Sequence, residues 1–168
     1  NYLIKEKKST LSKVKGLLGL KDEITSKKKG SSSSYLDSKN GLYKIRYTYA
    51  VGSRKPSLTK RDFCRNMMNM ANAGIVWTIE DIDRASREGV NRELGHNRQS
   101  YDLFKFKGGI YCRHKWKKVL YRLESNTEPS ENLGNYKKTK TIPKSYMKNP
   151  SGSKQAGIAP ENMPNRGA

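Results

Sequence analysis

The chain has few apolar residues for its length. Only 33% of its 168 residues are hydrophobic, and its mean hydropathy is −0.94. So little apolar surface cannot fold the whole chain around one core, so we expect a small folded centre with polar arms. No run of about eighteen apolar residues and no secretory signal pattern occurs, so we expect neither a membrane span nor a membrane partner.

Acidic residues are also scarce. The chain has 15 of them against 35 lysines and arginines, which gives a net charge of +20. A charge of this size favours a polyanionic partner such as DNA, RNA or an acidic protein surface. We identify no acidic pair with the pattern of a metal-dependent nuclease site, which argues against that class of enzyme.

Cysteine is nearly absent, with two residues in the chain. Two cysteines do not make a disulfide framework, so a reducing compartment fits best. The chain begins with Asn1 rather than Met, and we therefore expect it to be a piece of a longer or processed protein.

The composition divides the chain into three regions. Residues 1–40 form a basic arm and linker with ten lysines, a short amphipathic helix predicted around residues 10–20 and the low-complexity stretch 27–34. Residues 41–124 hold the periodic patterns of a folded α+β module. Residues 125–168 are rich in polar residues, Pro and Gly, and are predicted to be an extended basic tail.

The folded module begins with a predicted strand over residues 42–51. Aromatic and aliphatic side chains alternate there with Lys44 and Arg46, which predicts a half-buried strand with a basic outer face. A helix is expected from Ser57 or Thr59 to about residue 72, with Gly74 as its stop.

A second helix is expected after Thr78. Asp81, three residues further on, completes a capping box, and Gly89 is the predicted end of the helix. Residues 103–107 and 111–123 then read as a hairpin around two glycines. The predicted fold is thus α+β, a small three-stranded antiparallel sheet with two helices, flanked by long extended basic arms.

Seven basic residues are candidates for nucleic-acid contact because they lie on the predicted strands beside aromatic residues. The alternative, which the pattern leaves open, is a sheet whose aromatic residues pack inside while its lysines are merely solvated. The seven candidates are Lys44, Arg46, Arg113, Lys115, Lys117, Lys118 and Arg122.

A second candidate group consists of Cys64, Cys112, His114 and Trp116. Its first interpretation is structural, with a buried cysteine on a helix facing a buried cysteine on a strand. Thiolates and imidazoles also suit zinc, with His96 as a possible fourth ligand, but the usual paired cysteine spacing is missing. A nucleophilic Cys112 with His114 as its base is the enzymatic alternative. We predict a structural cluster with no metal, no cofactor and no catalysis.

Five motifs occur in a fixed order along the chain: LYKIRYTY at 42–49, RDFCRNM at 61–67, IEDI at 79–82, GGIYCRHKW at 108–116 and APENMPNRG at 159–167. Together they resemble the C-terminal cysteine-containing module of portal and minor head-type virion proteins from tailed phages of Bacteroidetes hosts, including crAss-like phages. Residues 91–100, which carry His96, depart from that pattern. The resemblance implies that the helix around Cys64 packs against the hairpin around Cys112, and it carries over no catalytic residue.

These observations give one expected function and two alternatives. The chain is expected to be a structural protein of a phage virion, at the portal or inside the head, assembled in the host cytoplasm. Its expected partners are portal, capsid or neck proteins, neighbouring copies of itself and packaged DNA. The alternatives are a nucleic-acid-binding protein that acts off the virion, and a cysteine- or metal-dependent enzyme.

Overall fold

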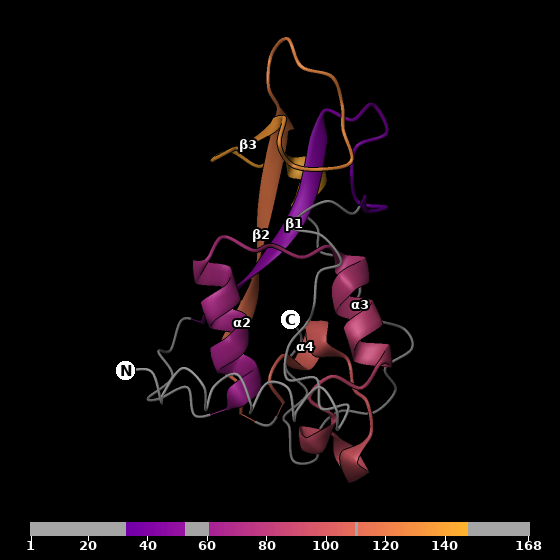
Figure 1. Cartoon of the computed structure of the whole chain (residues 1–168), viewed down its shortest axis with the longest axis vertical. Coiled ribbons are helices and arrows are strands. Elements are labelled where there is room, and N and C mark those ends of the chain that lie inside the picture. Colours follow the sequence, from indigo (N-terminus) through magenta and orange to yellow (C-terminus); the bar gives the residue numbers. More distant parts are fainter. Residues whose placement is uncertain (1–32, 53–60, 110, 148–168) are drawn as a thin grey trace, which may run out of the picture.

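The computed structural model describes residues 33–52, 61–109 and 111–147. The predicted helix at 10–20 and the motif at 159–167 lie outside these residues. The described part is an α+β fold with a three-stranded antiparallel sheet, as the sequence predicted, and three α-helices (Figure 1). The elements run in the order β1 (Tyr43–Val51), α2 (Asp62–Asn72), α3 (Ile79–Arg87), the 3-10 helices η1 (Arg92–Leu94) and η2 (His96–Arg98), α4 (Leu103–Phe106), β2 (His114–Leu123), β3 (Tyr136–Lys138) and the 3-10 helix η3 (Lys144–Tyr146).

The sheet has β2 in its centre. β1 pairs with it in antiparallel register from Tyr43 opposite Arg122 to Val51 opposite His114, and β3 pairs with the far end of β2. On the other edge of β1, Tyr47 and Trp77 exchange two backbone hydrogen bonds of 2.7 and 2.9 Å. The three α-helices lie between β1 and β2 in the chain, and they gather at the end of the sheet where β1 finishes and β2 starts (Figure 1).

The predicted hairpin at residues 103–123 is wrong in its first strand. Residues 103–106 form the short helix α4 because the Asp102 carboxylate accepts hydrogen bonds from the backbone N–H groups of Phe104 and Lys105. Three of the four helical residues are buried, which fits a helix packed in the core better than an alternating strand. The third strand instead comes from Tyr136–Lys138, within the predicted tail.

The helix boundaries agree closely with the local signals. Thr78 and Asp81 form the predicted capping box, with the Thr78 hydroxyl accepting from the Asp81 N–H at 3.1 Å. Gly74 and Gly89 both have positive φ, of 83° and 71°, just beyond the ends of α2 and α3. α2 begins at Asp62, later than predicted, since Arg61 has extended backbone angles.

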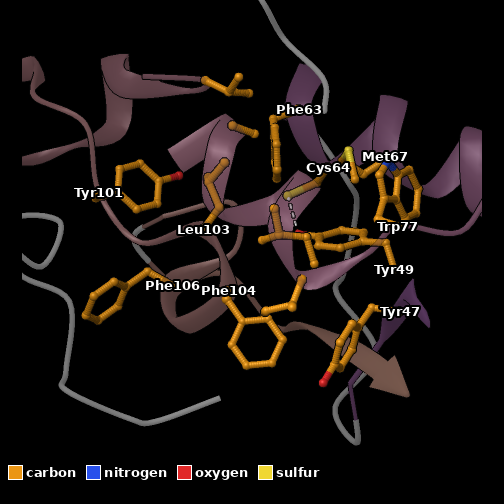
Figure 2. Close-up of a cluster of buried hydrophobic side chains, with 14 of the residues drawn as sticks. Tyr47, Tyr49, Phe63, Cys64, Met67, Trp77, Tyr101, Leu103, Phe104 and Phe106 are labelled. Atoms are coloured by element: carbon orange, nitrogen blue, oxygen red, sulfur yellow. Dashed lines mark hydrogen bonds between the residues drawn. The ribbon is translucent and has the colours of Figure 1, made fainter. Parts of the chain in front are cut away.

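The larger core lies on the face of the sheet that the helices cover. Figure 2 shows Tyr47, Tyr49 and Trp77 close to side chains from α2 and α4. The Tyr47 and Phe104 rings meet edge to face with centroids 5.2 Å apart. Trp116 on β2 donates its indole N–H to the Leu103 carbonyl at 2.9 Å, which ties the sheet to α4.

The opposite face carries a smaller cluster at the other end of the sheet, formed by Val76, Tyr121 and Tyr136. The Tyr136 hydroxyl donates to the Gly41 carbonyl at 2.9 Å. Among the described residues, no helix is long and apolar enough to cross a membrane.

Candidate functional site

Three predicted contact residues form an exposed row on the outer face of β2 and of the residue just before it. Arg113, Lys115 and Lys117 alternate along the chain with residues of the helix-covered face, and all three are exposed. Successive cations in an extended strand lie about 7 Å apart, so the row spans about 13 Å. None of the three forms an ion pair with any residue that the structure describes. The row can therefore receive an anionic partner without breaking an internal ion pair.

Lys44 and Arg46 lie on the same outer face but are buried, so the prediction that they are exposed is wrong. Arg46 is 0% exposed and pairs with Asp37, with a shortest distance of 2.7 Å. Lys44 donates to the Glu131 carbonyl at 2.9 Å and lies over the Tyr136 ring. Alternation indicated correctly that both leave the aromatic face, but it could not show that residues 33–42 and the segment before β3 cover them.

The last two predicted contacts differ from each other. Lys118 is half-buried and donates to the Tyr146 carbonyl at 2.7 Å, and desolvation by burial lowers its pKa. Arg122 is exposed and lines an open groove of about 610 Å³. The other cations of the groove, Lys137, Lys138 and Lys140, belong to the segment predicted to be a tail, and Lys137 pairs with Glu124 at 3.1 Å. Only the pairing of β3 with β2 brings them beside Arg122.

The cysteine and histidine residues do meet, at the end of the sheet beneath α2. Cys64 and Cys112 have their sulfur atoms 3.9 Å apart, and the Cys112 sulfur lies 3.5 Å from His114 Nδ1. Cys64 and His114 are buried, and Cys112 is half-buried. Trp116 reaches this group through Tyr49, whose ring it meets at 5.0 Å between centroids.

Two members of this cluster were not predicted from the sequence. The Tyr49 hydroxyl lies 3.4 Å from both sulfur atoms, and Figure 2 shows it directed at Cys64. Tyr49 also stacks on the His114 ring at 4.9 Å. Gly108, expected only to make a turn, leaves room for the thiols, because a Cβ there would lie 2.3 Å from the Cys64 sulfur.

The pKa values of the two thiols are shifted in opposite directions. The hydrogen bond with Cys64 lowers the pKa of Cys112. Burial raises this pKa, but hydrogen bonds with His114 and Tyr49 lower it further. The same hydrogen bond, together with burial, raises the pKa of Cys64. Of the two thiols, Cys112 is therefore the one that loses its proton more readily.

An enzymatic cysteine–histidine pair needs an acidic side chain that orients the imidazole. Among the described residues, none orients His114 in this way. Cys112 and His114 are within reach of each other, but His114 Nε2 is buried with no hydrogen-bond partner in the described part of the chain. A thiolate and base need a third group to hold the imidazole in place. His96 lies in η2 and does not belong to the group formed by Cys64, Cys112 and His114.

No protein-family model, curated protein or solved structure matches this chain. The resemblance to phage virion proteins accordingly stays a prediction based on the five motifs. The function has to be argued from the surface and from the buried cluster.

Proposed function

We propose that the chain is a structural protein of a tailed-phage virion, at the portal or inside the head, that contacts packaged DNA through the outer face of β2. The observation that carries the DNA contact is the row of exposed cations at Arg113, Lys115 and Lys117, free of ion pairs within the described residues. The segments 1–32 and 148–168, which lie outside the described residues, would contact neighbouring subunits. The virion placement rests on the motif resemblance.

The distribution of charge supports a directional contact with a polyanion. Residues 61–109, which hold all three α-helices, contain eight basic and seven acidic residues. Residues 111–147, which hold β2 and β3, contain nine basic and three acidic residues. Of these two described segments, the one that holds β2 and β3 therefore carries the larger positive excess, which favours the approach of a polyanion to β2.

The proposed contact depends on charge and not on base sequence. Extended lysine and arginine side chains on a paired strand can each neutralise a phosphate, and each neutralised phosphate releases condensed counterions. The end of β2 that carries the row pairs with β1, from His114 opposite Val51 to Lys117 opposite Thr48, so the row is held on a paired strand. We expect affinity that is similar for unrelated DNA sequences and falls steeply with salt.

The test is the salt dependence of DNA binding by the full chain and by the variant Arg113→Gln, Lys115→Gln, Lys117→Gln. Losing three phosphate contacts should reduce the slope of log K against log salt by about 3. The matched control is Arg87→Gln, Arg92→Gln, Arg98→Gln, which removes the same charge from exposed positions in and after α3. Equal losses in the two variants would show that net charge alone binds DNA and would contradict a contact through β2.

The virion placement has a separate test, which is the mass and copy number of the chain in purified particles. About a dozen copies of a protein much heavier than 19.1 kDa would support a portal or portal-linked protein. A mass near 19.1 kDa at high or variable copy number would support an internal head protein. Absence from particles would contradict the proposal and favour a DNA-binding protein that acts off the virion.

A further inference from the structure

The buried cluster has a metal-ligand geometry that does not depend on the proposed function. Cys64, Cys112 and His114 each offer one ligand atom, and the three atoms lie within 4.8 Å of one another. The ligands come from α2, from the segment before β2 and from the first residue of β2. Three donors of types that zinc prefers thus converge on one point from parts of the chain up to 50 residues apart.

The distances agree with those between the ligands of a tetrahedral zinc ion. Zinc–sulfur bonds of about 2.3 Å and zinc–nitrogen bonds of about 2.0 to 2.1 Å place two sulfurs about 3.8 Å apart, and a sulfur and a nitrogen about 3.6 Å apart. The observed separations are 3.9 Å between the two sulfurs and 3.5 Å between the Cys112 sulfur and His114 Nδ1. The third side, from Cys64 to His114, needs to close by at most about 1.2 Å to reach the same value.

We propose that Cys64, Cys112 and the Nδ1 atom of His114 bind one zinc ion, which replaces the metal-free cluster predicted from the sequence. Both thiols release their protons when the ion binds, and two thiolates balance its charge in a buried site. A water molecule can complete the coordination. This site differs from sequence-recognisable zinc motifs in that no two cysteines lie close together in the chain.

The surroundings of the cluster suit bound thiolates. The Tyr49 hydroxyl, 3.4 Å from each sulfur, can donate a hydrogen bond to a thiolate and hold it in place. Gly108 has no side chain to fill the space beside both sulfurs, and the Arg61 guanidinium donates to the Gly108 carbonyl at 2.8 Å. The arginine therefore both fixes this backbone segment and places a positive charge near the sulfurs.

The role that fits the position is structural. Zinc at this point would link α2 to the start of β2, in a chain whose apolar content is low for its length. Small modules with limited apolar cores commonly gain stability from a metal in this way. The ion would hold the helices against the same end of β2 that presents the row of cations.

The first experiment measures metal content and thermal unfolding of the full wild-type chain, purified without chelator. We expect about one zinc ion per chain, a lower midpoint after chelation, and recovery when zinc is restored. Cobalt in place of zinc should give thiolate-to-metal charge-transfer absorption. Because this series uses only the wild-type chain, it does not depend on whether a variant folds. Less than about 0.1 zinc per chain, with no change in the midpoint on adding zinc, would overturn the proposal.

The second experiment uses the only two histidines of the chain as a matched pair. His114→Gln should lose the metal or bind it at least about 10-fold more weakly, whereas His96→Gln should keep it. Tyr49→Phe should retain the ion with an affinity about 10- to 100-fold lower. Equal zinc content in the two histidine variants, or a Cys64–Cys112 disulfide in freshly purified protein, would contradict the site. Neither result alters the test of DNA binding by β2.

Discussion

The two faces of the sheet bury different kinds of side chain, although strand β1 contributes to both. On the helix-covered face, Tyr47 and Tyr49 pack among aromatic and aliphatic side chains. On the opposite face, Lys44 and Arg46 are buried through hydrogen bonds and an ion pair. Burial of apolar area is favourable by itself, whereas burial of a charge is tolerated only when a partner compensates its lost hydration.

The outer face also differs along its own length. At the end near β3 it is closed, because Asp37 accepts hydrogen bonds from the Ile45 N–H and from Arg46. At the other end it is open, and the cations at Lys115 and Lys117 lie opposite Ala50 and Thr48 of β1. The comparison shows that alternation of residue types separates two faces but does not say which part of a face meets water.

The largest effect should come from removing the centre of the aromatic face. Trp77 is 0% exposed and contacts Trp116 edge to face at 5.8 Å. Trp77→Ala should lower the free energy of unfolding by about 3 to 5 kcal/mol, measured by urea denaturation. The control is Tyr111→Ala, at a ring that is 70% exposed, which should cost less than about 0.5 kcal/mol. Similar losses would show that the helix-covered face is not the dominant core.

The second-largest effect is expected on the opposite face of the sheet, where β1 buries charged side chains. Asp37→Ala leaves the buried Arg46 guanidinium without its carboxylate, and we expect a loss of about 2 to 3 kcal/mol. The value lies below the range for fully buried pairs because Asp37 is 13% exposed. Adding Arg46→Met should restore most of the stability, since the buried charge is then removed together with its carboxylate. If the double variant were less stable than Asp37→Ala, the ion pair would not be the reason for the loss.

A smaller effect is expected at the entrance to α3, which packs over the aromatic face. Thr78→Ala removes the side-chain half of the capping box and should cost about 1 kcal/mol. The control is Thr141→Ala at an exposed position, expected within about 0.5 kcal/mol of wild type. The comparison of the two urea midpoints tests the capping box directly.

The smallest effect concerns Asp102, the acidic residue that begins α4. Burial raises the pKa of its carboxyl above 3.8, against the effect of the hydrogen bonds from Lys105 and Phe104. A raised pKa in the folded state favours the protonated form, so this contribution to stability is full below about pH 3.8 and is lost as the pH rises through the folded value. Asp102→Asn keeps the accepting oxygen, and Asn caps helices about as well as Asp, so this change should have the smallest effect of the four at pH 7.

The pH profile gives the sharper measurement for Asp102. Relative to wild type, Asp102→Asn should gain stability as the pH is raised from about 4 to 7, because the amide does not ionise. A difference between the two proteins that stays constant over this range would contradict the predicted pKa shift.

Several elements could be predicted because their signals are local. Alternation over residues 42–51 gave β1, the pair Thr78 and Asp81 gave the start of α3, and Gly74 and Gly89 marked helix ends. Local signals failed at α4, because four residues are too few to show a helical period and a single capping carboxylate, Asp102, decides the conformation. The exposed positions of Arg113, Lys115 and Lys117 fit both interpretations that the sequence left open, contact with nucleic acid and simple solvation.

The sequence by itself determined the basic excess, the α+β class and the alternation that separates the two faces of the sheet. The tertiary structure decided that Arg46 meets Asp37, that Tyr136–Lys138 completes the sheet, and that the Tyr49 hydroxyl lies between the sulfurs of Cys64 and Cys112. The reason is physical. Periodicity and capping act within a few residues, whereas these contacts depend on the register of paired strands and on helices packed from distant parts of the chain.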